Sequence, residues 1–238
     1  AVGPVDYPDD IGTHVRDPKI LEHDGIYYMV LGARTKDDRG CVLVYTSRDL
    51  EGWSYATRIE LGEKFCFMLE CPYLFELDGV LLLVCCPQGV PAAGWRYRNP
   101  HQCVWFSIEA DWGAPSFKIV GQGMPPMVDA GFDFYAPQSF EDAVGRRLMI
   151  GWSGCPDATA ENPTVARGWQ CALTVPRELS MRDGKLCQQP AHEIERMRGD
   201  CVLATGGETV EEPGRLFDLV VSCEGAKMVE LEIRKGVF

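Results

Sequence analysis

A strand–turn–strand unit recurs along the chain, and its spacing constrains the fold more than any other feature. The turns carry Asp24-Gly25, Asp78-Gly79 and, in a weaker copy, Gly145. The strand-like residues that flank these turns are 19–22 with 26–32, 72–77 with 80–86, and 135–141 with 146–152. An Asp-Gly pair between alternating apolar segments is a strong signal for a β-hairpin. The repeat therefore predicts an all-β fold.

Two further strand-like segments follow each hairpin: 41–47 and 53–59, then 102–108 and 117–120, then 170–176 and 185–189. The equivalent glycines, Gly25, Gly79 and Gly145, lie 54 and 66 residues apart, which fits four-stranded blades with long loops. The pattern predicts a partial β-propeller with about three blades. Propellers have about four to eight blades. Earlier blades are therefore expected upstream, with residues 1–13 as the tail of one of them.

The sequence changes character after residue 190. Residues 192–198 resemble a short helix, and 216–222 and 228–234 alternate like the strands of a sandwich. The predicted domains are the partial propeller at 1–190 and, at 191–238, a linker with the beginning of a C-terminal β-sandwich. The chain begins without Met and ends inside an apparent strand, so we expect both ends to be cut.

Composition narrows the kind of partner. The 238 residues carry 23 basic and 35 acidic side chains, a net charge of -12, so nucleic acid and anionic membranes are not expected partners. The longest apolar run, residues 80–86, is far shorter than the roughly 18–20 residues that span a bilayer. A small neutral molecule or another protein is the expected partner.

The eleven cysteines lie mostly inside apolar, strand-like segments, and their number is odd. This pattern favours reduced, buried thiols and a cytoplasmic protein over a disulfide framework. The sequence has no Cys-x-x-Cys pair and no closely spaced histidine pair, so neither a metal nor another cofactor is expected.

Polar residues near the start of each blade are the candidate site. The first strand of each propeller blade lines the central channel, so Arg16, Asp17, Glu70, Asp133 and Tyr135 are expected to converge at one mouth. Asp17 and Glu70 are 53 residues apart, close to the blade period, and are expected to occupy equivalent places. Glu70 follows an apolar segment, where burial would favour the protonated form that a general acid needs. Asp17, next to Arg16, is expected to stay ionised.

Each candidate also has a structural interpretation. Glu70 could be a strand-end carboxylate in solvent, and Arg16 with Asp17 an ion pair in a turn. Tyr135 could pack inside a blade instead of contacting a ligand. Trp152 and Trp169 likewise either offer an apolar face to a ligand or pack in the blade interior. The loop that carries Arg96 and Arg98 could reach a phosphate group or could be a solvated loop.

Several motifs, in order along residues 12–190, resemble those of glycoside hydrolase family 32, the β-fructofuranosidases. They are Thr-His-Val-Arg-Asp-Pro-Lys at 13–19, Leu-Glu-Cys-Pro at 69–72, Gly-Phe-Asp-Phe-Tyr-Ala-Pro-Gln at 131–138, Gly-Trp at 151–152 and Leu-Thr-Val-Pro-Arg-Glu-Leu at 173–179. The resemblance implies a five-bladed propeller that hydrolyses β-fructosides with retention, through a covalent fructosyl-enzyme. The substrate would be a small carbohydrate: sucrose, sucrose 6-phosphate or a short fructan.

The resemblance also implies roles for individual residues. Glu70 matches the general acid/base, Asp17 the residue that stabilises the transition state, and Arg16 a residue that holds the sugar. Asp133, Tyr135 and Trp152 are expected to bind substrate. The family's nucleophile is an aspartate in a Trp-x-Asn-Asp-Pro-Asn segment, which this chain lacks, so no residue here is assigned that role. The chain on its own is therefore expected to be inactive.

Two other classes remain open from the sequence. One is an inverting furanosidase of the family 43 type, which shares the five-bladed architecture. The other is a propeller that binds a sugar or a protein without catalysis.

Overall fold

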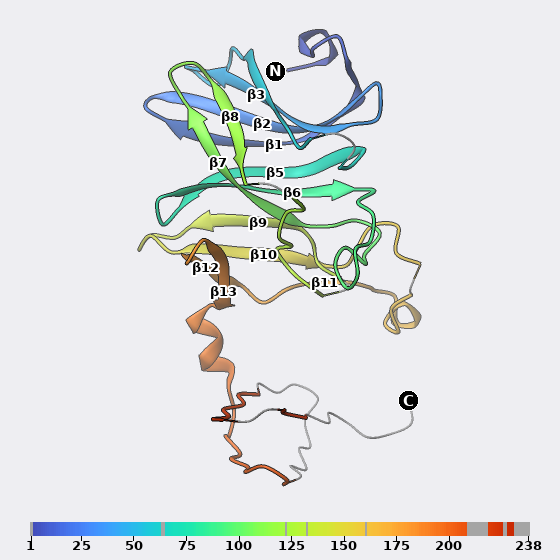
Figure 1. Ribbon diagram of the computed structural model, residues 1–238, viewed down its shortest axis with the longest axis vertical. Coiled ribbons are helices and arrows are strands. Elements are labelled where there is room, and N and C mark those ends of the chain that lie inside the picture. Colours follow the sequence, from blue (N-terminus) through green and yellow to red (C-terminus); the bar gives the residue numbers. More distant parts are fainter. Residues whose placement is uncertain are drawn as a thin grey trace. The chain divides into compact units, whose positions relative to one another are not determined.

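The computed structural model describes residues 2–62, 65–121, 123–131, 133–159, 161–208, 219–225 and 228–230. The chain divides into two compact units, Ala1–Ala191 and His192–Phe238. Within the described residues, all strands belong to the first unit and form three antiparallel sheets, which follow one another in Figure 1. These sheets are the propeller blades that the repeat predicts.

The first blade contains β1 (Ile11–His23), β2 (Ile26–Thr35), β3 (Gly40–Ser47) and β4 (Ser54–Glu60), paired in that order. The expectation that residues 1–13 belong to an earlier blade is wrong. Ile11 pairs with Thr35 inside this blade, because β1 is much longer than the apolar pattern indicates. Before it, a short 3-10 helix (Pro4–Asp6) packs on the same blade, where the Tyr45 hydroxyl donates to the carbonyl of Asp6 at 2.9 Å.

The second blade repeats this order with β5 (Met68–Leu77), β6 (Val80–Gln88), β7 (Val104–Asp111) and β8 (Ser116–Val120). Both inner hairpins turn at an Asp-Gly pair with positive φ at each residue, 49° and 74° at Asp24-Gly25 and 50° and 78° at Asp78-Gly79. These angles fit the tight turns whose twist matches that of the strands. The hairpin prediction is confirmed at both turns.

The third blade is less regular. It contains β9 (Tyr135–Glu141), β10 (Arg147–Ser153), β11 (Ala172–Leu173), β12 (Arg177–Arg182) and β13 (Lys185–Pro190). β10 pairs with β9 on one side and with both β11 and β12 on the other. A single strand over 170–176 was expected, but the third strand breaks there. At the break the Thr174 hydroxyl accepts a bond from the Gly151 N–H at 3.0 Å, and Pro176 has no N–H to donate.

The innermost strand of every blade is interrupted at the same place by an X-Pro pair. The register shifts at Asp17-Pro18 in β1, at Cys71-Pro72 in β5 and at Ala136-Pro137 in β9. The residue before each proline has a positive φ, 59° at Asp17, 48° at Cys71 and 46° at Ala136. Proline without an N–H suits such a bulge. The bulge therefore fixes equivalent positions in the three blades.

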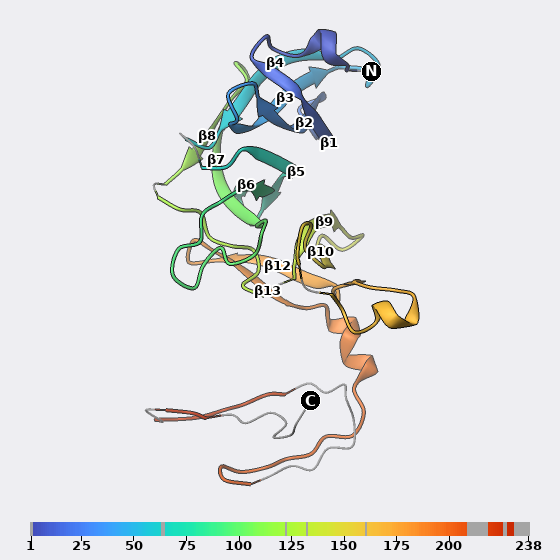
Figure 2. The same ribbon diagram turned by 90° about the vertical axis from the view of Figure 1, so that its right-hand side faces the viewer.

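The core lies between the blades, which Figure 2 shows nearly end-on. The middle strands β2, β3 and β6 are buried along almost their whole length, because both of their faces are covered. Side chains such as Val30, Leu69 and Leu83 fill the space between the first and second blades. Phe75, Phe134 and Met149 belong to the cluster between the second and third.

The second unit begins with a 3-10 helix, His192–Met197, where a short helix was expected. The strands expected at 216–222 and 228–234 are not formed in their described parts, 219–222 and 228–230, and the rest of each lies outside the described residues. In the part of the chain that the structure describes, no helix is long and apolar enough to cross a membrane.

The approach of β2 to β5 yields a stability prediction. A Cβ placed on Gly32 would lie 2.2 Å from the backbone oxygen of Leu69 in the next blade. Gly32→Ala should therefore push the first two blades apart and lower the free energy of unfolding by about 1–3 kcal/mol, the usual cost of overpacking. Urea denaturation measures this, with Gly52→Ala as the control, since its Cβ would approach no atom closer than 3.9 Å. Equal stability of the two variants would contradict the tight contact.

Candidate active site

Three residues in equivalent positions, one from each blade, meet at the bulges. Arg16, Glu70 and Tyr135 each lie directly before an X-Pro pair. The Arg16 Nε donates to Glu70 Oε1 at 2.8 Å, and the Tyr135 hydroxyl donates to Glu70 Oε2 at 2.6 Å. The expected convergence of Arg16, Glu70 and Tyr135 is thus present in the structure.

Glu70 has a third donor that the sequence did not indicate. The Gln88 side-chain amide, at the end of β6, donates to Glu70 Oε2 at 2.9 Å. The Glu70 side chain is 16% exposed. It is therefore neither a solvent-facing strand end nor a carboxyl group in purely apolar surroundings. It is a largely buried carboxylate held by one cation and two neutral donors.

The expectation that Asp17 and Glu70 occupy equivalent places is wrong by one residue. The X-Pro bulge is the repeated feature, and it aligns Asp17 with Cys71, 54 residues later, and Arg16 with Glu70 at the same separation. The sequence contained this signal, since Gly25 and Gly79 are also 54 residues apart. Aligning Asp17 with Glu70 because both are carboxylates hid this 54-residue period.

This register reverses the expected environments of the two carboxylates. The cation of Arg16 contacts Glu70, whereas the Asp17 carboxylate accepts the backbone N–H of Cys71 at 2.9 Å and its thiol at 3.6 Å. Asp17 is thereby held beside the residue that follows Glu70. The hydrogen bond to Cys86, followed by burial, raises the pKa of the Cys71 thiol far above its ordinary value, so this thiol stays protonated.

Tyr135 packs inside the blade, which was one of its two interpretations, and it also contacts Glu70. Its ring is buried in the cluster between the second and third blades, while its hydroxyl reaches Glu70. Burial raises the pKa of the Tyr135 hydroxyl well above its ordinary value, and the neighbouring Cys86 thiol and Glu70 add to the effect. The hydroxyl therefore remains protonated and acts as a donor.

A second layer lies next to these residues along the same strands. Lys19, Tyr73 and Gln138 each follow the proline of a bulge. The Lys19 ammonium donates to Gln138 Oε1 at 2.8 Å and lies 4.6 Å from the centre of the Tyr73 ring. This layer joins all three innermost strands and supports the strand segments that carry Arg16, Glu70 and Tyr135.

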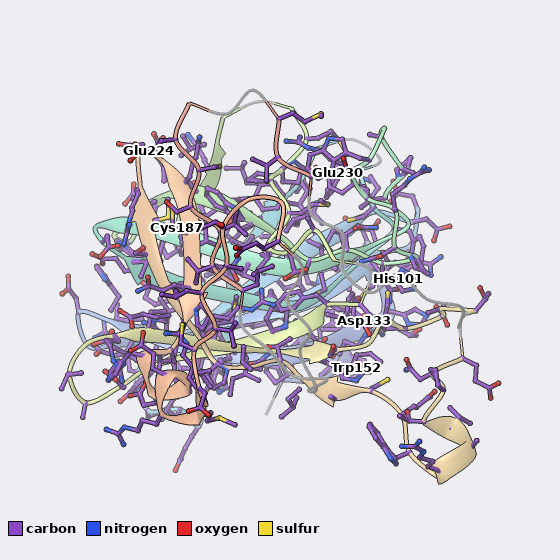
Figure 3. All side chains as sticks on the ribbon, turned by 90° about the horizontal axis from the view of Figure 1, so that it is seen from below. His101, Asp133, Trp152, Cys187, Glu224 and Glu230 are labelled. Atoms are coloured by element: carbon purple, nitrogen blue, oxygen red, sulfur yellow. The ribbon has the colours of Figure 1, made fainter. Side chains whose placement is uncertain are left out.

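Asp133 and Trp152 lie at the end of the third blade that bears Tyr135. The Ser153 hydroxyl donates to Asp133 at 3.2 Å, and Trp152 pairs with Tyr135 across the sheet. Figure 3 labels both residues on the same side of the propeller as His101. Trp152 is half-buried, whereas Trp169 is exposed and therefore does not pack in the blade interior.

His101 is a residue near the site that the sequence analysis missed. Its ring is buried, its Nε2 lies 2.8 Å from a carboxylate oxygen of Asp157, and its centre is 6.2 Å from that of Tyr135. A bridge between Gln88 and His101 joins the two sides of the loop. No local sequence pattern indicates His101, because its contacts form only when the loop folds.

The described residues contain no group of three or more His, Cys, Asp or Glu side chains that could hold a metal ion. Asp17 and Glu70 come from neighbouring blades, and Asp17 accepts the N–H of Cys71, the residue after Glu70. Most glycosidases use a pair of carboxyl groups to cleave the glycosidic bond.

Propeller blades with two neighbouring carboxylates are typical of glycosidases, and the comparisons with known proteins identify the family. Residues 3–190 match the family described as "Glycosyl hydrolases family 32 N-terminal domain". The chain belongs to glycoside hydrolase family 32. The family 43 alternative is thereby set aside.

The chain is similar to curated enzymes of this family. It is 36% identical over 238 residues to the sucrose-6-phosphate hydrolase of Salmonella typhimurium, covering 97% of this chain and 50% of that enzyme. It is 39% identical over 197 residues to the sucrose-6-phosphate hydrolase of Bacillus subtilis, covering 80% and 40%. The chain thus spans about half the length of the curated relatives it matches.

Solved structures show the same similarity. The β-fructofuranosidase of Bombyx mori aligns with a TM-score of 0.74 and 32% identity, over 83% of this chain and 41% of that one. The sucrose-6-phosphate hydrolase of Lactobacillus gasseri aligns with a TM-score of 0.73 and 32% identity, over 82% and 40%. These alignments agree with the propeller assignment.

The donors on Glu70 give a testable prediction. Tyr135→Phe removes one of the two donors to Glu70 Oε2 and should lower kcat/KM for a fructoside by about 10-fold or more in an enzyme that contains these blades, the effect of one hydrogen bond to a charged group. Tyr73→Phe is the matched control, because Tyr73 lies in the second layer and its hydroxyl contacts Arg147 instead. Similar losses in both variants would mean that the Tyr135 hydroxyl has no particular role at Glu70.

Proposed function

We propose that this chain supplies the acid/base part of the active site of a retaining β-fructofuranosidase. The observation that carries the proposal is the buried Glu70 carboxylate, held by Arg16, Gln88 and Tyr135 at the bulges where the blades meet. Membership of family 32 supports the reaction class. The nucleophile would come from a part of the enzyme outside these residues.

Glu70 would act twice in the reaction. In the first step it gives a proton to the glycosidic oxygen as that bond breaks and a carboxylate nucleophile forms an ester with the fructosyl carbon. In the second step it takes a proton from water as the water oxygen displaces the ester. The first step restores the carboxylate, so Glu70 returns to its protonated form only when the second step is complete.

The contacts of Glu70 suit these two protonation states. All three neighbours donate, which fits the ionised carboxylate that activates water. The protonated form needs one oxygen free of a donor. The Arg16 side chain is long and 36% exposed, so it can move more easily than the buried Tyr135 side chain. Movement of Arg16 would therefore free Oε1 for the proton.

Asp17 would bind ring hydroxyls of the fructosyl group. The Cys71 N–H already occupies its Oδ2, which leaves Oδ1 for a substrate hydroxyl. Asp133, Tyr135, Trp152 and Arg16 would complete the substrate-binding surface, since they lie at the same end of the innermost strands. Substrate binding by these four residues remains a prediction.

The substrate would be a small β-fructoside. The curated relatives are named sucrose-6-phosphate hydrolases, and a mutant of the Bombyx mori β-fructofuranosidase has been solved in complex with sucrose. Sucrose, sucrose 6-phosphate and short fructans all contain the fructosyl group that Asp17 would bind and whose glycosidic bond Glu70 would help to cleave.

We further propose a reducing, cytoplasmic location. All eleven cysteines are free, and six of them are buried. Burial raises the pKa of the Cys41 and Cys66 thiols to about 12, so both stay protonated and unreactive at neutral pH. Such thiols fit a compartment that keeps cysteine reduced.

The acid role of Glu70 predicts a dependence on the leaving group. In an enzyme that contains this chain, Glu70→Gln should lower kcat/KM for sucrose, which reports the first step, by about 10²–10⁴, the contribution of a positioned general acid. The loss should shrink for an activated fructoside whose leaving group needs no proton. Asp17→Asn should instead lower activity on both substrates, because the fructosyl ring is common to them. A Glu70→Gln loss that is the same for both substrates would contradict the acid role.

The thiols give a second prediction. In the native protein at pH 8, a thiol reagent should modify the exposed Cys201 and Cys223 quickly and leave Cys41 and Cys66 unmodified, because those two ionise only near pH 12. After denaturation without reductant, all eleven should react, since unfolding returns the thiol pKa to about 8.5. Finding four or five disulfides in the protein isolated from its own host would overturn the cytoplasmic proposal.

A further inference from the structure

The loop between β6 and β7 lies beside Glu70. Gln88, the last residue of β6, donates to Glu70 and forms a bridge with His101 on the returning side of the loop. The Asn99 side chain donates to the carbonyl of Gly131, two residues before Asp133. The loop is thus tied at its base to the second blade and to the segment that enters the third.

The tip of this loop is a tight turn that presents two exposed side chains. Ala93 and Arg96 exchange both backbone hydrogen bonds at 3.0 Å, and Gly94 has a φ of 61°. Trp95 is 69% exposed, and the Arg96 guanidinium lies 5.5 Å from the centre of its ring. The turn therefore offers an aromatic face with a cation stacked near it.

Tyr97 fixes the loop between Arg96 and Arg98. Its side chain is fully buried, its hydroxyl donates to the carbonyl of Pro125, and its backbone N–H points to the sulfur of Met127 at 3.4 Å. The residues on either side are exposed. Arg96 and Arg98 thus flank one anchored residue. Because the backbone here is already fixed, ligand binding would lose less conformational entropy.

Within the described part of the chain, neither of these two cations has an acidic partner. Among the described residues, neither Arg96 nor Arg98 forms an ion pair, whereas most arginines elsewhere in the propeller do: Arg16, Arg34, Arg39, Arg58, Arg146, Arg147 and Arg177. Two carboxylates around His101 and the start of the third blade have other partners, Asp157 with His101 and Asp133 with Ser153. In a chain of net charge -12, two unpaired arginines beside the site favour an anionic ligand.

We propose that Trp95, Arg96 and Arg98 bind the phosphate-bearing leaving sugar of a phosphorylated β-fructoside. This rests on the proposed function and specifies its substrate class. The leaving sugar carries the oxygen that Glu70 protonates on C1, and a 6-phosphate is attached through C6 to C5, on the other side of the ring oxygen. Arginine matches phosphate with two parallel hydrogen bonds, and Trp95 offers a flat face to the ring.

The loop is close enough for this arrangement. Arg98 is three residues from His101, so their Cα atoms are at most about 10 Å apart. The His101 ring is 6.2 Å from that of Tyr135, whose hydroxyl contacts Glu70. A guanidinium at the end of a long side chain can therefore meet a phosphate on a sugar that is bonded at Glu70.

Binding tests the inference without requiring hydrolysis. The chain should bind glucose 6-phosphate more tightly than glucose or inorganic phosphate in calorimetric titrations. The double variant Arg96→Gln/Arg98→Gln should weaken glucose 6-phosphate binding by about 100-fold, since each lost charge-assisted bond is worth about 10-fold or more. Arg182→Gln is the matched control, another exposed arginine without an ion pair among the described residues, and should change nothing. Equal binding of inorganic phosphate and glucose 6-phosphate, or equal affinity in the double variant, would overturn the inference.

Kinetics separate this inference from the proposed function. In an enzyme that contains the chain, the double variant should lower kcat/KM for sucrose 6-phosphate by about 100-fold and that for sucrose by less than about 3-fold. If both substrates fall equally, the loop is structural and the inference fails, although the proposed function stands. If no fructoside is cleaved by the parent enzyme, the proposed function fails and the binding titration alone decides the inference. A thermal melt of each variant confirms that the loop still folds.

Discussion

The X-Pro bulge in the innermost strand of each blade is the constraint on which the site depends. It holds Asp17, Cys71 and Ala136 at positive φ and so places Arg16, Glu70 and Tyr135 in equivalent positions. Residues 54 and 65 positions apart thereby meet within hydrogen-bond distance. The same bulge aligns the layer of Lys19, Tyr73 and Gln138. The strain of a positive φ at three non-glycine residues is balanced by contacts that cross from one blade to the next.

These crossing contacts also explain why the carboxylates differ. Glu70 receives a cation and two neutral donors from three different elements, whereas Asp17 receives a backbone N–H and a thiol from the neighbouring blade. A carboxylate surrounded by donors that can rearrange suits proton transfer, and one fixed by a backbone N–H suits the binding of a hydroxyl. The proposed division of roles therefore follows from position in the repeat, not from the local sequence around each residue.

Much of the fold was predictable from the sequence, because hairpin turns and buried strands leave local patterns. Asp24-Gly25 and Asp78-Gly79 located two blades, and the run at 80–86 marked β6. The start of β1 at Ile11 was missed because an inner strand that lines a channel carries polar residues and loses its alternation. The break before Arg177 was missed because it depends on a hydroxyl of Thr174 that replaces a backbone partner. The contacts of Gln88 and His101 with the site are tertiary and had no local pattern to reveal them.

The central claim is that Glu70 transfers the proton in a retaining reaction. The most direct test is chemical rescue of Glu70→Ala, in an enzyme that contains this chain, by sodium azide with an activated fructoside. Azide needs no general base, so it should attack the fructosyl ester, restore turnover and give a fructosyl azide of retained configuration that NMR identifies. Rescue of that kind is the predicted result. A fructosyl azide of inverted configuration, or an unrescued variant whose fructosyl ester still hydrolyses at the normal rate, would contradict the account.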